Sequence, residues 1–71
     1  MSYPRLVQLV GVSGWLLGIT HERSTGFQCW LVNPQGRVLN DRQFHSTEAE
    51  ASQAGRAFIQ VSQRSGKPQA F

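Results

Sequence analysis

Cysteine is almost absent from this chain: among its 71 residues, only Cys29 carries a thiol. A single cysteine excludes an intramolecular disulfide and a structural zinc site of the usual multi-thiolate kind. A lone cysteine within a strand-like segment typically packs as a small buried hydrophobic residue. We therefore expect Cys29 to be buried and unreactive, and its solitary thiol fits a reducing cytoplasm.

Long apolar runs are missing as well. The longest run, from Leu6 to Ile19, is interrupted by Gln8, Ser13 and three glycines. It is shorter than the ~20 apolar residues that a membrane-spanning helix needs. The start of the chain also lacks the charged region and the cleavage pattern of a signal peptide. The sequence predicts no membrane span and a soluble, cytoplasmic protein.

Charge is sparse and dispersed. Six arginines and one lysine against four acids give a net charge of +3, and the arginines form no run. Nucleic-acid-binding domains usually show a clustered basic patch, so this pattern favours solubility over recognition. A chain of this length predicts one small domain spanning 1–71, with a stability on the order of 3–5 kcal/mol.

Catalytic constellations are missing too. His21, Glu22 and His45 are the only candidates for acid–base chemistry, and no paired carboxylates, Ser/His/Asp order or phosphate-binding glycine loop accompany them. We expect both histidines in solvated loops, and two histidines without a third ligand give no recognisable metal spacing. The sequence predicts a protein that is not an enzyme and that binds no cofactor and no metal.

The most informative segment that the chain does contain is Asn33-Pro34-Gln35-Gly36, set between two apolar runs. Proline presets φ near −65° at the second position of a turn, and an asparagine side chain can hydrogen-bond back to the main chain. Glycine supplies the left-handed conformation that closes such a turn. This segment predicts a β-hairpin.

The flanking segments have the composition of strands. Residues 5–12 are rich in Val and Leu, which favours a strand over a helix, although the weak alternation leaves both open. Residues 15–20 and 27–32 alternate between two faces, and the polar segment 21–26 predicts the loop that joins them. Residues 37–44 form either one bent strand or two short ones.

The segment after His45 predicts an amphipathic helix. Thr47 and Glu50 have capping-box spacing, and Glu48 suits the positive end of the helix dipole. Gly66 and Pro68 predict its end, between a loose N-terminus at 1–4 and a C-terminal tail at 66–71. At 100° per residue, one arc of this helix is formed by small and apolar residues: Ala51, Ala54, Gly55, Phe58, Ile59, Val61 and Ser62.

Together these elements predict an α+β fold, an antiparallel β-meander of three to four strands with one C-terminal helix packed on one face. Phe27, Cys29 and Leu31 are expected to face the helix, with Phe58 as the helix anchor. Trp30 then lies beside Gln28 on the opposite, uncovered face. The alternative is that both tryptophans belong to the core.

The order strand, strand, Asn-Pro-Gln-Gly turn, strand, then Ser-Thr-Glu-Ala-Glu-Ala opening a helix resembles the layout of plant APETALA-type and integrase amino-terminal DNA-binding domains over roughly residues 14–62. The resemblance implies a sheet that lies in the major groove of DNA and contacts it through arginines and tryptophans. The segment 15–20 carries no charge here, unlike the arginine-rich first strand of those families, so no binding residues are transferred.

The uncovered face suggests the function. An exposed tryptophan beside arginines is a typical energetic centre of a protein interface. We therefore expect a non-enzymatic interaction module that docks on a larger protein through its open sheet face or an edge strand, with homodimerisation through an unpaired edge as a further expectation. The alternative is an accessory nucleic-acid-binding domain that uses the same face. The expected partner-binding residues are Trp30, Gln28, Arg23, Arg37 and Arg42.

Overall fold

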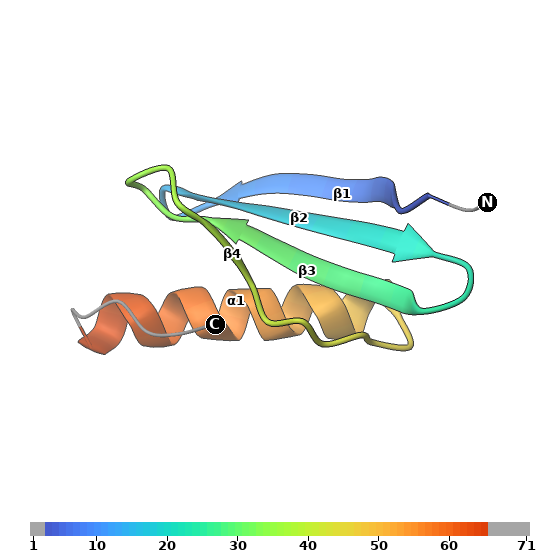
Figure 1. Cartoon of the computed structure of the whole chain (residues 1–71). Helices are drawn as coiled ribbons and strands as arrows, with labels where there is room; N and C mark the ends of the chain where they lie inside the picture. Colours follow the sequence, from blue (N-terminus) through green and yellow to red (C-terminus); the bar gives the residue numbers. More distant parts are fainter. Residues whose placement is uncertain (1–2, 66–71) are drawn as a thin grey trace.

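The computed structural model describes residues 3–65 and consists of a four-stranded antiparallel sheet followed by one helix (Figure 1). The strands lie in sequence order, β1-β2-β3-β4, so the predicted α+β meander is confirmed with four strands. The expected helix stop at Gly66 and Pro68 and the tail at 66–71 lie outside the described residues. The elements are β1 (Arg5–Val12), β2 (Trp15–Glu22), β3 (Gly26–Val32), β4 (Val38–Asn40) and α1 (Glu48–Ser65).

Residues 5–12 are a strand, which settles the choice that the sequence left open. β1 pairs with β2 through a two-residue turn in which Ser13 and Gly14 both have left-handed φ angles, 51° and 86°. Two successive left-handed residues are the signature of the type I′ turn, whose twist matches that of the flanking strands. The turn therefore fixes the end of the first hairpin.

The predicted turn at 33–36 is present, and Asn33 organises it. Its amide donates to the Arg37 carbonyl at 2.9 Å, and its carbonyl accepts from the Gly36 amide at 2.8 Å. Its Oδ1 accepts from the amides of Gln35 at 3.0 Å and Arg37 at 2.8 Å. Gly36 takes the left-handed φ of 87° that the sequence indicated. One asparagine thus satisfies two amides that would otherwise depend on water.

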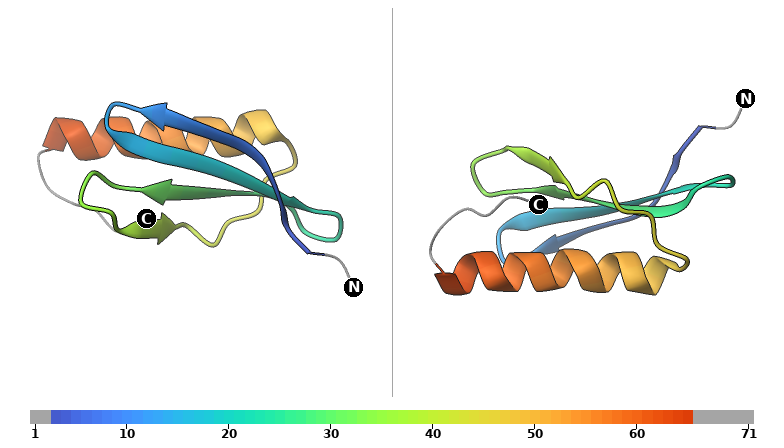
Figure 2. Two further views of the ribbon diagram at one scale, coloured as in Figure 1. Left: turned by 90° about the horizontal axis from the view of Figure 1, so that it is seen from above. Right: turned by 60° about the horizontal axis from the view of Figure 1, so that its bottom comes forward.

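α1 begins where the capping signal predicts. The Thr47 hydroxyl accepts a hydrogen bond from the Glu50 amide at 3.1 Å, which is the N-cap interaction. The helix lies along one face of the sheet and contacts β2 and β3, and no helix of residues 3–65 lies on the other face (Figure 2). The two layers meet closely at Gly55, which is buried.

The core lies between α1 and the sheet and follows the predicted alternation. Trp15 is buried and Trp30 lies on the other face, so the alternative that both tryptophans belong to the core is wrong. Phe27 and Phe58 pack against the core but are only half-buried, Phe58 edge-on to Trp15 with ring centroids 6.1 Å apart. The buried apolar residues are Trp15, Leu17, Ile19, Cys29, Leu31, Ala51 and Ile59.

Val61 corrects the predicted helix arc, because its side chain is 45% exposed. The buried stripe of α1 follows Ala51, Gly55, Ile59 and Ser62, which is narrower than the arc drawn from the sequence. Val61 precedes Ser62 by one residue and is therefore rotated about 100° away from it. A single helix on a twisted sheet covers only a narrow line of contacts.

The segment 37–44 forms one short strand followed by a loop, so neither the single bent strand nor the two short strands that the sequence left open is present. β4 holds only three residues, and the chain then leaves the sheet through a loop in which Arg42 has a left-handed φ of 58°. It returns at His45, whose amide and carbonyl exchange hydrogen bonds with Phe27 at 2.7 and 2.9 Å. The returning chain pairs with the β3 edge at Phe27, beyond the end of β4, and leads to the start of α1.

Candidate interaction surface on the open sheet face

The face of the sheet away from α1 is built from three rows of opposed residues. One row runs from Gly11 through Leu16 and Val32 to Val38. The strand register gives two more rows: Leu9, Gly18, Trp30 and Asn40 form the second, and Leu6, Thr20 and Gln28 form the third. The open-face patch, as named from here on, comprises Leu6, Leu9, Leu16, Trp30, Val32 and Val38.

A β-bulge places two leucines of β1 on this patch. Leu6 pairs with Thr20, but the next residue to pair is Gln8 with Ile19, so Val7 is an extra residue in the strand. In a regular strand, residues three apart point to opposite faces. Because the bulge inserts one residue, Leu6 and Leu9 point to the same face instead.

Gly18 is covered by these two leucines. A Cβ atom at Gly18 would stand 3.6 Å from Leu6 Cδ1 and 3.7 Å from Leu9 Cδ1. The glycine itself is buried, although it lies on the face without a helix. A glycine in the middle of a strand often allows the close approach of a bulky neighbour. Here it allows Leu6 and Leu9 of β1 to pack over the centre of the sheet.

Trp30 has its one polar atom satisfied within the face. Its indole Nε1 donates a hydrogen bond to Thr20 Oγ1 at 2.9 Å, and the side chain is 37% exposed. A buried or half-buried tryptophan usually needs such a partner. Here the partner is on the neighbouring strand, so the exposed part of Trp30 contributes ring surface and needs no further hydrogen bond.

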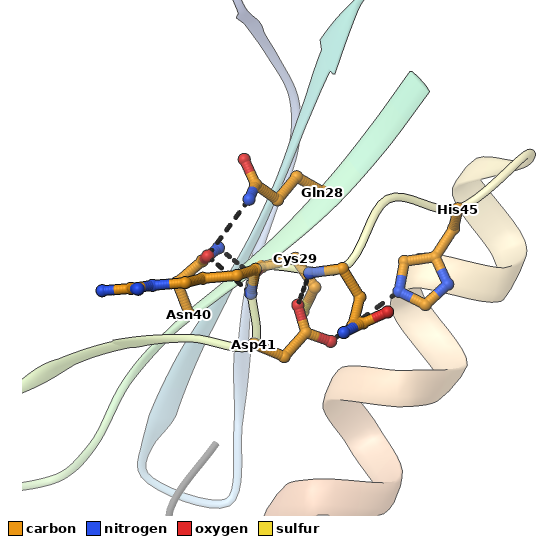
Figure 3. A network of polar contacts seen from close by, with 7 residues as sticks. Gln28, Cys29, Asn40, Asp41 and His45 are labelled. Atoms are coloured by element: carbon orange, nitrogen blue, oxygen red, sulfur yellow. Dashed lines mark hydrogen bonds and ion pairs between the residues drawn. The ribbon is translucent and has the colours of Figure 1, made fainter. Parts of the chain in front are cut away.

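Gln28 and Asn40 form a second internal network, drawn in Figure 3. Gln28 Nε2 donates to Asn40 Oδ1 at 3.1 Å, and Asn40 Nδ2 donates to the Cys29 carbonyl at 2.9 Å. Asn40 Oδ1 also accepts from the Arg42 amide at 2.8 Å. Asn40 thus ends β4 with side-chain bonds in place of further strand pairing.

The arginines expected at the site lie at its borders. Arg23 is in the turn before β3 and Arg37 is in the turn after it, so the seven residues of β3 separate them by ~20 Å. Arg42 follows β4, and all three are exposed. The structure brings Gln28 and Trp30 onto one face, but it does not gather the arginines around Trp30.

The histidines are more enclosed than the sequence indicated. His21 belongs to β2 and is half-buried, stacked on Phe27 with ring centroids 4.4 Å apart. His45 is also half-buried, and its Nε2 lies 3.8 Å from Asp41 Oδ2. His45 does lie in a connection, as expected, but the expectation of solvated histidines is wrong for both. The His21 ring packs on Phe27, and main-chain pairing with Phe27 holds His45 against the sheet.

Cys29 has no exposed surface, and burial first, then the nearby Asp41 charge, raises the pKa of its thiol to about 11. A thiol with that pKa is a poor nucleophile at neutral pH, because the thiolate is the reactive form. Within residues 3–65, no three His, Cys, Asp or Glu side chains are grouped so that they could hold a metal ion.

Three patch residues escaped sequence reasoning: Leu6, Leu9 and Val38, each about 60% exposed. The apolar composition of residues 5–12 marks a strand, but no turn residue or glycine marks the bulge that turns Leu6 outward. The face on which Val38 lies could not be predicted, because the sequence left the strand pattern of residues 37–44 open. Only the pairing register reveals that these side chains join Trp30.

Comparison of the chain with known protein families, with curated proteins and with solved structures gives no match. The likeness to APETALA-type and integrase DNA-binding domains therefore rests on the order of the elements alone. Over residues 3–65, α1 is the only helix, and it is not apolar enough to cross a membrane.

Proposed function

We propose that this chain is a non-enzymatic interaction module that docks on a larger protein through the open-face patch. The observation that supports this most directly is the state of the polar side chains on that face. Thr20, Gln28, Trp30 and Asn40 already take part in hydrogen bonds within the protein. These internal bonds lower the cost of covering the face, because burying a polar group without a hydrogen-bond partner is unfavourable.

The size of the patch supports the same role. Leu6, Leu9 and Val38 are about 60% exposed, and Leu16 is 46% exposed. Together with Trp30 they present on the order of 500 Å² of apolar surface, within the range at which the largest patch on a monomer is often functional. A stable interface buries about 800 Å² on each partner, so the patch would form its apolar centre.

The residues of the chain also suit binding better than catalysis. The raised pKa of Cys29 argues against covalent chemistry at neutral pH. A depression of about 300 Å³ lies between the first turn and α1, but its lining includes Ser13, Arg56, Gln60 and Gln63 and no acid–base pair.

We propose the cytoplasm as the compartment, because a lone free cysteine suits a reducing environment.

The test compares substitutions at two apolar residues whose exposed fractions are nearly the same. Leu16 on the patch and Val61 on α1 are 46% and 45% exposed. The tagged protein and its Leu16→Gln and Val61→Gln variants are used to capture partners from native lysate, and the captured proteins are quantified by mass spectrometry. The proposal expects a protein retained by wild type and Val61→Gln and lost from Leu16→Gln. Equal capture by all three variants contradicts docking through the patch.

Self-association is proposed at the β1 edge. β1 is eight residues long and, within residues 3–65, pairs with no strand on its outer side, whereas the opposite edge strand β4 is only three residues long. Unpaired edges of this length can pair with a second copy. Sedimentation over a concentration series tests this, and a strictly monomeric protein at high concentration contradicts it.

Accessory nucleic-acid binding is the second candidate. Four arginines stand against two acids in residues 3–47, which favours an anionic ligand. The separation of Arg23 from Arg37 and the leucines between them weaken this candidate, because phosphate binding needs clustered cations. A gel shift at low ionic strength with duplex and single-stranded DNA and RNA tests it, and the absence of any retardation removes it.

A further inference from the structure

The border of the open-face patch carries an excess of positive charge. Arg5 directly precedes Leu6, Arg37 directly precedes Val38, and Arg42 follows the Asn40 that ends the central row. Arg23 lies at the turn between β2 and β3. All four are exposed, and among residues 3–65 no hydrogen bond or ion pair is formed by their guanidinium groups.

The two acids of the same region are already engaged. Asp41 lies 3.8 Å from His45 and accepts a hydrogen bond from the Gln43 amide at 2.9 Å. Glu22 accepts from the Thr25 hydroxyl at 3.3 Å. Both carboxylates keep their negative charge, so four arginines around the patch stand against two acids and leave an excess of two positive charges. The patch itself has no charged side chain.

The dimensions of the patch match one helix. Neighbouring strands lie about 4.8 Å apart, so the four strands span ~14 Å, and a helix with its side chains is about 10–12 Å across. The protein's own α1 already covers two central strands in this way on the opposite face (Figure 1). One further helix could cover the patch and reach the arginines on both sides.

Resting on the proposed docking function, we infer that the partner segment is an amphipathic helix with an apolar stripe flanked by carboxylates. The apolar stripe would cover Leu9, Leu16 and Trp30, and the carboxylates would pair with the arginines at the border. A second copy of this chain does not fit face to face, because two identical sets of unpaired arginines would then meet, and like charges disfavour association. A nucleic acid supplies negative charge but not the apolar stripe.

The experiment uses two synthetic peptides of about 18 residues. Both have leucines at i, i+3, i+4 and i+7 spacing; one carries glutamates beside the leucines and its twin carries lysines at the same positions. The full ¹⁵N-labelled chain is titrated with each peptide at low and at high salt. We expect the glutamate peptide to bind at least about tenfold more tightly at low salt, which corresponds to 1.4 kcal/mol, and this preference to shrink as salt rises.

Chemical shifts locate the binding, and charge reversal tests its cause. The glutamate peptide should shift the amides of Leu9, Leu16 and Trp30 more than those of α1. The Arg37→Glu, Arg42→Glu double variant should lose the preference for glutamate, while Arg56→Glu on α1 keeps it. Thermal melts establish that both variants are folded.

The outcomes separate this inference from the function on which it rests. Equal affinity for both peptides, with shifts at the patch, overturns the acidic partner but leaves docking through the patch intact. Shifts confined to α1, or no binding of either peptide, overturn the inference, and the Leu16→Gln capture then decides the docking function independently. Displacement of the glutamate peptide by a short DNA duplex, with larger shifts from the DNA, overturns it in favour of nucleic-acid binding.

Discussion

Gly55 is the residue at which a single added atom would force the helix and the sheet apart. A Cβ at this position would stand 2.5 Å from Cys29 Sγ and 2.8 Å from Leu17 Cδ1. Both neighbours are fully buried, so neither can move aside freely. Glycine in a helix is about 1 kcal/mol worse than alanine, so packing outweighs helix propensity here.

We therefore expect Gly55→Ala to lower the free energy of unfolding by about 1–3 kcal/mol, as overpacking usually does. Urea denaturation followed by circular dichroism measures the change. The double variant Gly55→Ala, Cys29→Ala should recover part of the loss, because it removes the sulfur nearest to the new methyl group. A Gly55→Ala protein more stable than wild type would show that helix propensity dominates and that the layers are less close.

Cys29 should make stability depend on pH above neutrality. Burial, with a smaller effect of Asp41, raises the pKa of its thiol from 9.0 to about 11. The folded protein therefore holds this proton more tightly than the unfolded chain, so the contribution is fully present below pH 9 and is lost as pH rises towards 11. Melting temperatures at pH 8 and pH 10.5 should differ more for wild type than for Cys29→Ala. Equal differences would mean that the thiol titrates normally.

At the scale of the element, the bulge in β1 combines two effects. It places Leu6 on the open face with Leu9, and it interrupts the regular edge that β1 presents to solvent. Bulges are one of the devices by which edge strands avoid pairing with other chains. We therefore expect the bulge at Val7 to limit self-association through the outer edge of β1.

Deleting Val7 tests this role. Without it, Leu6 would still pair with Thr20 and Gln8 with Ile19, so the strand would become regular while each side chain kept its face. Val7 is 38% exposed and does not pack against the core cluster, so its removal leaves the core side chains in place. We expect the deletion variant to self-associate at least about tenfold more tightly than wild type, since a regular edge offers a longer ladder. Sedimentation equilibrium measures this, and unchanged or weaker association would show that the bulge does not protect the edge.

The elements that could be predicted from the sequence are those with a local signal. Pro34 and Gly36 mark a turn, Thr47 and Glu50 mark a helix start, and alternation through Leu31 marks a core strand, because each pattern acts within a few residues. The bulge at Val7 and the early end of β4 depend on which residues pair across strands. Half of the open-face patch could not be predicted for that reason.

At the scale of the whole molecule, the core and the proposed docking surface lie on opposite faces of one sheet. The face toward α1 holds the fully buried side chains, and the other face holds most of the exposed large hydrophobic residues of the sheet. A domain of this size has a free energy of unfolding of only a few kcal/mol, so the loss of one buried side chain on the covered face can unfold it. Substitutions on the open face should therefore affect the stability of the protein less than substitutions on the covered face.

Leu31 and Leu16 form a matched pair for testing this division. They are the same residue on neighbouring strands, but Leu31 is fully buried against α1 and Leu16 is 46% exposed on the patch. We expect Leu31→Ala to cost about 2–5 kcal/mol, because it removes a buried side chain and leaves a cavity. That loss equals most of the stability of so small a domain, so the variant should be largely unfolded at 37 °C.

Leu16→Ala should cost less than about 1 kcal/mol, because solvent already reaches much of its side chain. It should also weaken binding of the captured partner, by about 2 kcal/mol or more where Leu16 is a central contact. Denaturation of both variants under one set of conditions gives the comparison directly. Equal destabilisation by the two substitutions would mean that the open face contributes to the core of the folded protein, and the patch would then be a structural surface rather than a docking site.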